Sequence, residues 1–210
     1  MPHTNASLPA LLDGCAVIPV LTISHIEDAL PLAEALVKGG LNVLELTLRT
    51  PVALEALHLI AAEIPEAIIG AGTVNTPELL TQVTDAGARF AVSPGHTDRL
   101  LDAAENSPTP LLPGVATASE VMHLMEQGYS MLKLFPAEAI GGRELLKSFS
   151  GPLAHAKFCP TGGISPDLAP SYLSLPNVVC VGGSWMVSAQ DIANRDWAKI
   201  ETLARAAARF

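Results

Sequence analysis

The stretch Asn42-Val-Leu-Glu-Leu-Thr-Leu-Arg-Thr-Pro51 joins a β-strand directly to the start of a helix. Polar and apolar residues alternate up to Leu48, which is the period of a strand. Thr50 and Pro51 then place a capping hydroxyl before a proline at a first helical position, and apolar residues at helical spacing continue to Glu63. The stretch therefore predicts one strand–helix unit with a short join.

This alternation of short apolar runs with helical patterns recurs about eight times along the chain. The predicted strands, rich in Val, Ile, Leu or Phe, are Ala16–Thr22, Asn42–Leu48, Ala67–Thr73, Phe90–Pro94, Leu111–Val115, Met131–Phe135, Lys157–Thr161 and Val178–Gly182. The helical patterns between them include Ile26–Lys38, Pro51–Glu63, Pro77–Ala86 and Ser119–Gln127. Further helix starts are predicted at Thr76-Pro77 and Ser165-Pro166.

A run of such units, closed by a final helix around Trp197–Arg209, favours an α/β fold of the (β/α)8 TIM-barrel type over a doubly wound sheet. Residues 7–14 are expected to form a short N-terminal helix across the bottom of the barrel. No linker or low-complexity segment interrupts the pattern, so residues 1–210 are expected to form a single domain. In such a barrel, catalytic side chains come from the carboxyl ends of the strands.

The composition limits the kinds of partner that the protein is expected to have. Apolar residues make up 49% of the chain and charged residues 16%, a balance that predicts a homo-oligomer in which some surface is buried between subunits. The formal net charge of -9, with 12 scattered Lys and Arg residues, argues against a nucleic-acid partner. The start of the chain has no basic segment, and the apolar run Ala16–Ile23 is too short to span a bilayer. A soluble, cytoplasmic protein with no membrane contact is therefore expected.

The cysteines and histidines predict neither a disulfide framework nor a metal site. Three cysteines, Cys15, Cys159 and Cys180, lack metal-ligand spacing and are expected to be buried free thiols. The histidines show no His-x-x-x-His pattern, and they are His3, His25, His58, His96, His123 and His155. A mechanism without a metal or other cofactor is therefore favoured.

Lys133 lies within the apolar strand Met131-Leu-Lys-Leu-Phe135, where an ammonium group is costly. Burial favours the neutral amine, which is the nucleophile that condenses with a ketone to form a Schiff base. The structural alternative is a lysine that forms an ion pair with a buried carboxylate. The position thus predicts either a catalytic amine or a buried ion pair.

Alternation sorts the residues of the second predicted strand onto two faces. Its leucines should face the helices, whereas Glu45, Thr47 and Arg49 should point into the barrel near its top. A buried Glu45 can act as a general base, and the guanidinium of Arg49 can bind a carboxylate through two parallel hydrogen bonds. The alternative here is an internal ion pair between Glu45 and Arg49.

Glycine pairs follow the last two predicted strands, in Thr161-Gly-Gly163 and Gly182-Gly-Ser184. In phosphate-binding barrels the loops after strands 7 and 8 supply backbone amides to the phosphate, and glycine lets the main chain come close. Ordinary turns would also use such glycines. Their presence in both loops favours a phosphate site.

Small residues crowd the expected active-site face and are expected to leave room for a compact substrate. They lie in Gly70-Ala-Gly-Thr73, Ser93-Pro-Gly95 and Pro113-Gly-Val115. Thr73 could donate a hydrogen bond to the carboxylate of a keto acid. Pro94 and Phe135 could form walls of the pocket.

Taken together, the motifs make the chain resemble the family of 2-keto-3-deoxy-6-phosphogluconate (KDPG) aldolase and 4-hydroxy-2-oxoglutarate (KHG) aldolase, over nearly its whole length. The motifs that carry the resemblance are Val43-Leu-Glu-Leu-Thr-Leu-Arg-Thr50, Gly70-Ala-Gly-Thr-Val74, Leu132-Lys-Leu-Phe-Pro-Ala137, Cys159-Pro-Thr-Gly-Gly-Ile164 and Gly182-Gly-Ser-Trp185. They occur in the order of the family, and together they are highly specific.

The resemblance implies a class I aldolase on a (β/α)8 barrel, usually a homotrimer, that splits a phosphorylated keto-deoxy sugar acid into pyruvate and glyceraldehyde 3-phosphate. It implies that Lys133 is the Schiff-base lysine and Glu45 the general acid and base. It also implies substrate-binding roles around the pyruvyl carboxylate, in the pocket walls and at the phosphate end. These residues are Arg49, Thr73, Thr161, Pro94, Phe135, Gly162, Gly163, Gly183 and Ser184.

Other functions are compatible with parts of this pattern. Members of the family that prefer the galactonate-derived epimer, or an unphosphorylated hydroxy-oxoglutarate, share the same lysine and glutamate. A phosphate-binding barrel isomerase or epimerase would share the glycine loops but would not require Lys133 in an apolar strand. A sugar-phosphate binding protein without catalysis is the alternative from another class.

Overall fold

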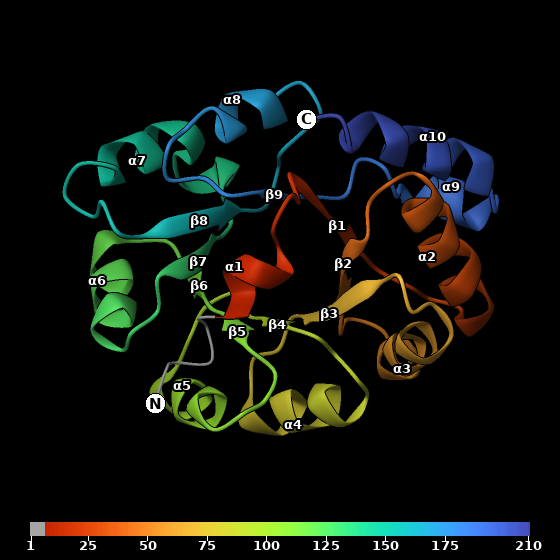
Figure 1. Ribbon diagram of the computed structural model, residues 1–210, viewed down its shortest axis with the longest axis horizontal. Helices are drawn as coiled ribbons and strands as arrows, with labels where there is room; N and C mark the ends of the chain where they lie inside the picture. Colours follow the sequence, from red (N-terminus) through yellow and green to blue (C-terminus); the bar gives the residue numbers. More distant parts are fainter. Residues whose placement is uncertain (1–6) are drawn as a thin grey trace.

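The computed structural model describes residues 7–210, and its helices surround a ring of parallel strands (Figure 1). The strands are β1 (Val17–Leu21), β2 (Val43–Thr47), β3 (Ile68–Gly72), β4 (Ala91–Val92), β5 (Leu111–Leu112), β6 (Gly114–Val115), β7 (Met131–Leu134), β8 (Lys157–Pro160) and β9 (Val181–Gly183). The α-helices are α1 (Leu8–Leu11), α2 (Ala29–Lys38), α3 (Ala53–Glu63), α4 (Pro77–Asp85), α5 (Asp98–Glu105), α6 (Ala118–Glu126), α7 (Gly142–Phe149), α8 (Ala169–Leu173), α9 (Ala189–Ala193) and α10 (Trp197–Ala207). The 3-10 helices are η2 (Ile26–Asp28) and η3 (Glu138–Ile140).

The strands close into a barrel. One sheet has the order β5-β4-β3-β2-β1-β9 and the other β6-β7-β8, and the strand pairs of both are parallel. Bridges from Phe158 to Val178 and from Thr161 to Gly182 link β8 to the segment that contains β9. Pro113 separates β5 from β6, so the predicted fifth strand is divided at a residue that cannot donate a backbone hydrogen bond. The predicted (β/α)8 barrel is confirmed, and the doubly wound alternative is wrong.

Two of the three predicted helix starts differ from the structure. Thr76 caps α4 as predicted, because its hydroxyl accepts a hydrogen bond from the N–H of Leu79 at 3.2 Å. Thr50 instead donates its hydroxyl proton to the carbonyl of Ile23, and α3 begins only at Ala53. Ser165 accepts from the N–H of Leu168 in a turn, so α8 likewise begins later than predicted.

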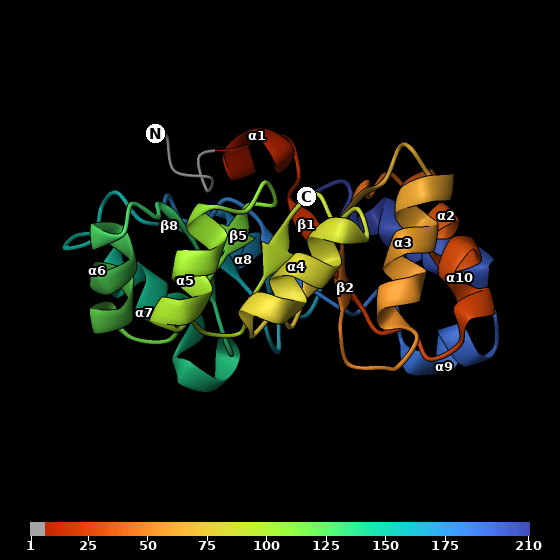
Figure 2. The ribbon, with the colours of Figure 1, turned by 90° about the horizontal axis from the view of Figure 1, so that it is seen from below.

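The lower part of the barrel is filled by apolar side chains and thiols. Leu8 and Leu12, 0% and 1% exposed, belong to the same buried cluster as residues from the strands. The other members of this cluster are Ile18, Val43, Phe90, Val92, Leu112, Met131, Cys159 and Cys180, with Cys15 and Ile68 packed against them. Figure 2 shows α1 at one end of the barrel, so the predicted short helix across the bottom is confirmed.

The two faces of β2 follow the predicted alternation. Leu44 and Leu46 are fully buried in the outer core beneath the helices, with Leu48 packed against it. Glu45 and Thr47 are also buried, although they are polar, which places them inside the barrel. None of the helices within residues 7–210 combines the length and the apolar character needed to cross a membrane.

Candidate active site

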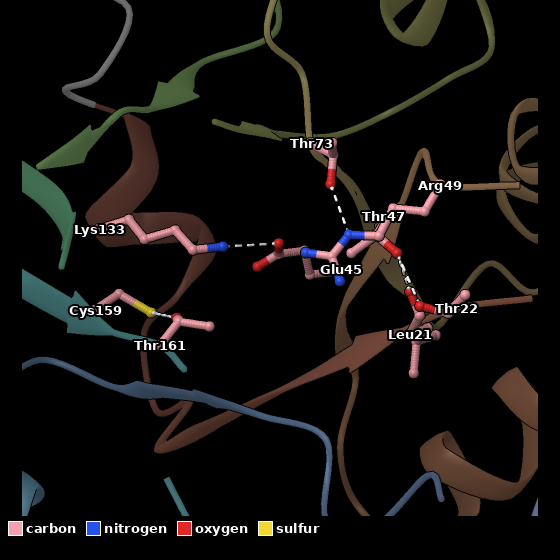
Figure 3. Close-up of polar contacts among 9 residues, drawn as sticks. All are labelled: Leu21, Thr22, Glu45, Thr47, Arg49, Thr73, Lys133, Cys159 and Thr161. Carbon is pink, nitrogen blue, oxygen red and sulfur yellow. Dashed lines mark hydrogen bonds and ion pairs between the residues drawn. The ribbon is translucent and has the colours of Figure 1, made fainter. Parts of the chain in front are cut away.

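Lys133 and Glu45 face each other inside the barrel. The Nζ atom of Lys133, on β7, lies 3.0 Å from Oε1 of Glu45, on β2 (Figure 3). The two residues are 5% and 2% exposed, so both charges are removed from bulk water. A buried ion pair was the structural alternative for Lys133, and its partner proves to be the carboxylate predicted as a general base. Bringing an amine and a carboxylate into contact gives the amine a direct acceptor for its proton.

Gly72 makes room for the Glu45 carboxylate. In the β2–β3 pairing Gly72 lies opposite Thr47, and a Cβ atom at this position would collide with Oε1 and would stand 2.9 Å from Cγ of Glu45. A Cβ at Gly70 would likewise overlap the ring of Phe90. The space left by these two glycines is therefore filled by neighbouring side chains.

A methyl group at position 72 is expected to displace the Glu45 carboxylate, which is the predicted general base. Gly72→Ala should lower kcat strongly and destabilise the fold by about 1–3 kcal/mol, the usual cost of overpacking. Steady-state kinetics and urea unfolding would measure both effects. Gly151→Ala is the matched control, because a Cβ at Gly151 meets nothing within 4 Å. An unchanged kcat in Gly72→Ala would show that turnover does not depend on the exact position of the Glu45 carboxylate.

An aromatic ring and a thiol border the lysine. Nζ of Lys133 lies 5.4 Å from the centroid of the half-buried Phe135 ring, within the range of a cation–π contact. Cys159 pairs with Lys133 in the β7–β8 register. A hydrogen bond with Cys180 and the charge of Lys133 lower the pKa of the Cys159 thiol, against the opposing effect of burial.

The three cysteines are free thiols, as predicted. Cys159 and Cys180 are buried, whereas Cys15 is only partly buried, which corrects the prediction for that residue. Burial nonetheless raises the pKa of Cys15 to about 12. The Cys15 thiol therefore remains protonated at neutral pH.

Arg49 lies at the rim of the barrel rather than within it. Its side chain is exposed, and Nε donates to Oγ1 of Thr73 at 3.3 Å (Figure 3). Thr73 directly follows β3 and has a φ of 66°, a left-handed conformation that is rare for threonine. The alternative of an ion pair between Glu45 and Arg49 is wrong, because Glu45 pairs with Lys133. The Arg49 guanidinium is thus exposed to solvent.

Thr47 has a packing role that its residue type did not indicate. Its hydroxyl donates to the carbonyl of Leu21 at 2.7 Å and lies 3.1 Å from Oγ1 of Thr22, a residue not singled out from the sequence (Figure 3). These contacts tie the carboxyl ends of β1 and β2 together. They fix the strand that carries Glu45.

The predicted phosphate-end residues lie at the carboxyl ends of β8 and β9. Thr161, which was predicted to lie beside the pyruvyl carboxylate, is buried and bridges to Gly182. The phosphate-end residues Gly162 and Gly163 follow it with φ values of 108° and 80°. Ser184 is exposed and lines a cavity of about 620 Å³ beside the end of β1. The lining of that cavity includes neither Lys133 nor Glu45.

Pro94 is exposed and lies against β6, the strand that pairs with the Lys133 strand β7. A Cβ at Gly114 would collide with the carbonyl group of Pro94, and Gly114 is the β6 residue paired with Lys133. Pro94 thus lies against the strand next to β7, whereas Phe135 directly follows β7 itself. Both positions fit the predicted pocket walls.

Within residues 7–210 no three His, Cys, Asp or Glu side chains are grouped so that they could hold a metal ion. His3 lies outside the described residues. His96 and His123 stack with ring centroids 5.6 Å apart, and His123 pairs with Asp98 at 3.2 Å. These contacts join the loop after β4 to α5 and α6.

Comparisons with known proteins agree over almost the whole chain. The model of one family, KDPG and KHG aldolase, matches residues 9–203. A 2-dehydro-3-deoxy-phosphogluconate aldolase of Dickeya dadantii is 50% identical, and a KHG/KDPG aldolase of Escherichia coli is 48% identical; each alignment covers 99% of this chain and 97% of the relative.

A solved structure gives the same result. The KDPG aldolase of Legionella pneumophila, crystallised with pyruvate captured as a covalent carbinolamine intermediate, has a TM-score of 0.92 at 52% identity. The match covers 94% of this chain and 96% of that chain. The similarities in sequence and in fold thus extend over both strands that carry the buried amine and carboxylate.

Proposed function

The chain belongs to the KDPG and KHG aldolase family, and on this premise we propose that it cleaves 2-dehydro-3-deoxy-6-phosphogluconate into pyruvate and glyceraldehyde 3-phosphate. It is a lyase, and the lysine mechanism makes it a class I aldolase. We also assign it the cleavage of 4-hydroxy-2-oxoglutarate to pyruvate and glyoxylate, because one relative at 48% identity is named for both substrates. The observation that carries the proposal is the buried 3.0 Å contact between Nζ of Lys133 and Oε1 of Glu45.

Lys133 begins the proposed reaction. Its ammonium group passes a proton to Glu45 across the hydrogen bond, and the neutral amine attacks the C2 ketone of the substrate. Glu45 returns the proton to the C2 hydroxyl, which leaves as water from the carbinolamine. The product is a protonated imine, which serves as an electron sink without a metal ion.

Glu45 then acts in both directions. Its carboxylate takes the proton of the C4 hydroxyl, directly or through a water, while the C3–C4 bond breaks and its electrons form an enamine. The aldehyde leaves, and protonated Glu45 gives its proton to C3. Water then hydrolyses the protonated imine, which releases pyruvate and regenerates Lys133 as its ammonium group.

The remaining site residues are proposed to hold the two ends of the substrate. Arg49 and Thr73, already hydrogen-bonded to each other, and Thr161 would bind the pyruvyl carboxylate. Pro94 and Phe135 would form the walls of the pocket. At the phosphate end the proposed groups are the backbone and hydroxyl of Gly162, Gly163, Gly183 and Ser184.

We assign the gluconate epimer because the relative at 50% identity is named for it. A barrel isomerase would not need the buried pairing of Lys133 with Glu45.

The high apolar content and the family membership support a homotrimer that works in the cytoplasm with a small keto-acid substrate. Residues 1–210 would form its single barrel domain.

Trapping with borohydride tests the Schiff base. Sodium borohydride added with pyruvate is expected to fix one pyruvyl unit on Lys133, since it reduces the imine to a stable amine. Intact-mass and peptide analysis would locate the adduct. Cleavage of the keto acid without any trapped adduct would refute the lysine mechanism.

Inorganic phosphate tests the glycine loops. It is expected to compete with the phosphorylated substrate while leaving cleavage of 4-hydroxy-2-oxoglutarate unaffected, because the second substrate carries no phosphate. Initial rates at a series of phosphate concentrations would give the inhibition constant. Equal inhibition of both substrates, or of neither, would remove the phosphate site from the proposal.

A further inference from the structure

The loop after β7 is bonded to the loop after β8. The N–H of Ala137 donates to the carbonyl of Thr161 at 2.8 Å, and the N–H of Glu138 donates to the carbonyl of Gly162 at 3.1 Å. The first of these loops follows the strand that carries Lys133, and the second contains the proposed phosphate-binding amides. Two consecutive hydrogen bonds thus set the position of one loop relative to the other.

The side chain of Glu138 packs directly on the glycine pair. A Cβ atom placed on Gly163 would stand 2.8 Å from Cβ and 2.9 Å from Cγ of Glu138. Gly163 also has a φ of 80°, which L side chains rarely adopt. The aliphatic stem of Glu138 therefore lies against the backbone of the phosphate loop and limits where its amides can point.

Tyr172 fixes the end of that side chain. It lies on α8, is 1% exposed, and its phenol O–H donates a hydrogen bond to Oε1 of Glu138. Burial and the carboxylate raise the pKa of Tyr172 above its usual value, so the phenol keeps the proton that it donates. A hydrogen bond to a charged acceptor is among the stronger ones in proteins. Glu138 thus contacts the glycine loop through its stem and Tyr172 of α8 through its carboxylate.

We propose that Glu138 and Tyr172 are positioning residues for the phosphate end of the substrate: Tyr172 fixes the carboxylate of Glu138, and the stem of Glu138 holds the Gly162–Gly163 backbone in place. Neither residue reaches the reacting carbon atoms in this role. The inference rests on the proposed function, because it requires that the glycine loop binds phosphate. The inference predicts that changes at these two residues affect the kinetics of the phosphorylated substrate and not those of 4-hydroxy-2-oxoglutarate.

The test compares Tyr172→Phe and Glu138→Ala with the wild type on two substrates. For the phosphorylated substrate, KM and the inhibition constant of inorganic phosphate are expected to rise, by up to about tenfold for the loss of one hydrogen bond. The kcat value for this substrate and the kinetics with 4-hydroxy-2-oxoglutarate should stay at the wild-type level. Glu138→Gln keeps the stem and an acceptor oxygen, so its KM should stay near the wild-type value.

Tyr129→Phe is the matched control, since Tyr129 is 2% exposed and precedes the opposite end of β7. It should leave both substrates unchanged. In a double-mutant cycle, Tyr172→Phe combined with Glu138→Ala should raise KM no further than Glu138→Ala alone. Glu138 is exposed, so its variants remain informative if Tyr172→Phe does not fold.

Three results would overturn the inference. They are an unchanged KM in Glu138→Ala, an equal loss on both substrates, and a KM increase in Glu138→Gln as large as in Glu138→Ala. Failure of the proposed function has a different signature, in which the wild type itself is not inhibited by phosphate. The two failures are therefore separated by the wild-type measurement alone.

Discussion

Lys133→Ala is expected to abolish turnover, with kcat lowered by roughly 10⁴-fold or more, because the variant lacks the amine that contacts Glu45. The same variant should give no borohydride-trapped pyruvate. The alanine also leaves the Glu45 charge buried without its partner, at a cost of about 3–5 kcal/mol. Circular dichroism and urea unfolding must therefore accompany the kinetics, to separate lost chemistry from lost structure.

Lys133→Gln provides the second variant for this experiment. Its amide can still donate a hydrogen bond to Glu45 and fill much of the same volume, but it cannot form an imine. Lys157→Ala is the matched control, because Lys157 begins β8 with an exposed side chain that donates to the carbonyl of Pro176. Substantial turnover in a folded Lys133 variant, or pyruvate trapped on another lysine, would contradict the mechanism.

Glu45→Gln is expected to lower kcat by about 10²–10⁴-fold, which is the usual contribution of general acid–base catalysis. The Lys133 amine remains, so pyruvate should still be trapped by borohydride, although more slowly. This separates the two roles: loss of Lys133 prevents the imine, whereas loss of the carboxyl group slows the proton transfers around it. Rapid-quench trapping and steady-state kinetics on one preparation would measure both.

Glu63→Gln serves as the control, since Glu63 is an exposed residue at the end of α3. Its kcat should equal that of the wild type. An unchanged kcat in Glu45→Gln would remove Glu45 from acid–base catalysis and would leave it as the structural partner of Lys133. A complete loss of trapping would instead give it an essential part in imine formation.

The parts of the site that follow from strand period were predictable from the sequence. Alternation alone put Glu45 inside the barrel and the leucines of β2 outside, because successive side chains of a strand point to opposite faces. The polarity of Lys133 within an apolar strand also marked it without any structure. Arg49 lies beyond the end of β2, where alternation no longer holds, and its side chain proved to be exposed.

The contacts between distant segments could not be predicted. Glu45 and Lys133 are 88 positions apart, and their pairing depends on how the barrel closes. Thr50 does not cap α3 for the same reason, because its hydroxyl donates a hydrogen bond to the carbonyl of Ile23 on a neighbouring segment. The proposed positioning role of Tyr172 could not be predicted from the sequence, because a tyrosine at helical spacing indicates only a core residue.

The closed lower end of the barrel limits the route by which substrates and products can pass. The buried cluster that contains Leu8 and Leu12 closes the barrel beneath Lys133. Substrates and products therefore pass through the opposite end, where the glycine loops lie. In the proposed mechanism the aldehyde leaves while the three-carbon fragment is still covalently attached to Lys133. Pyruvate is then the last product released and the first reactant bound in synthesis, which makes the enzyme kinetically ordered in both directions.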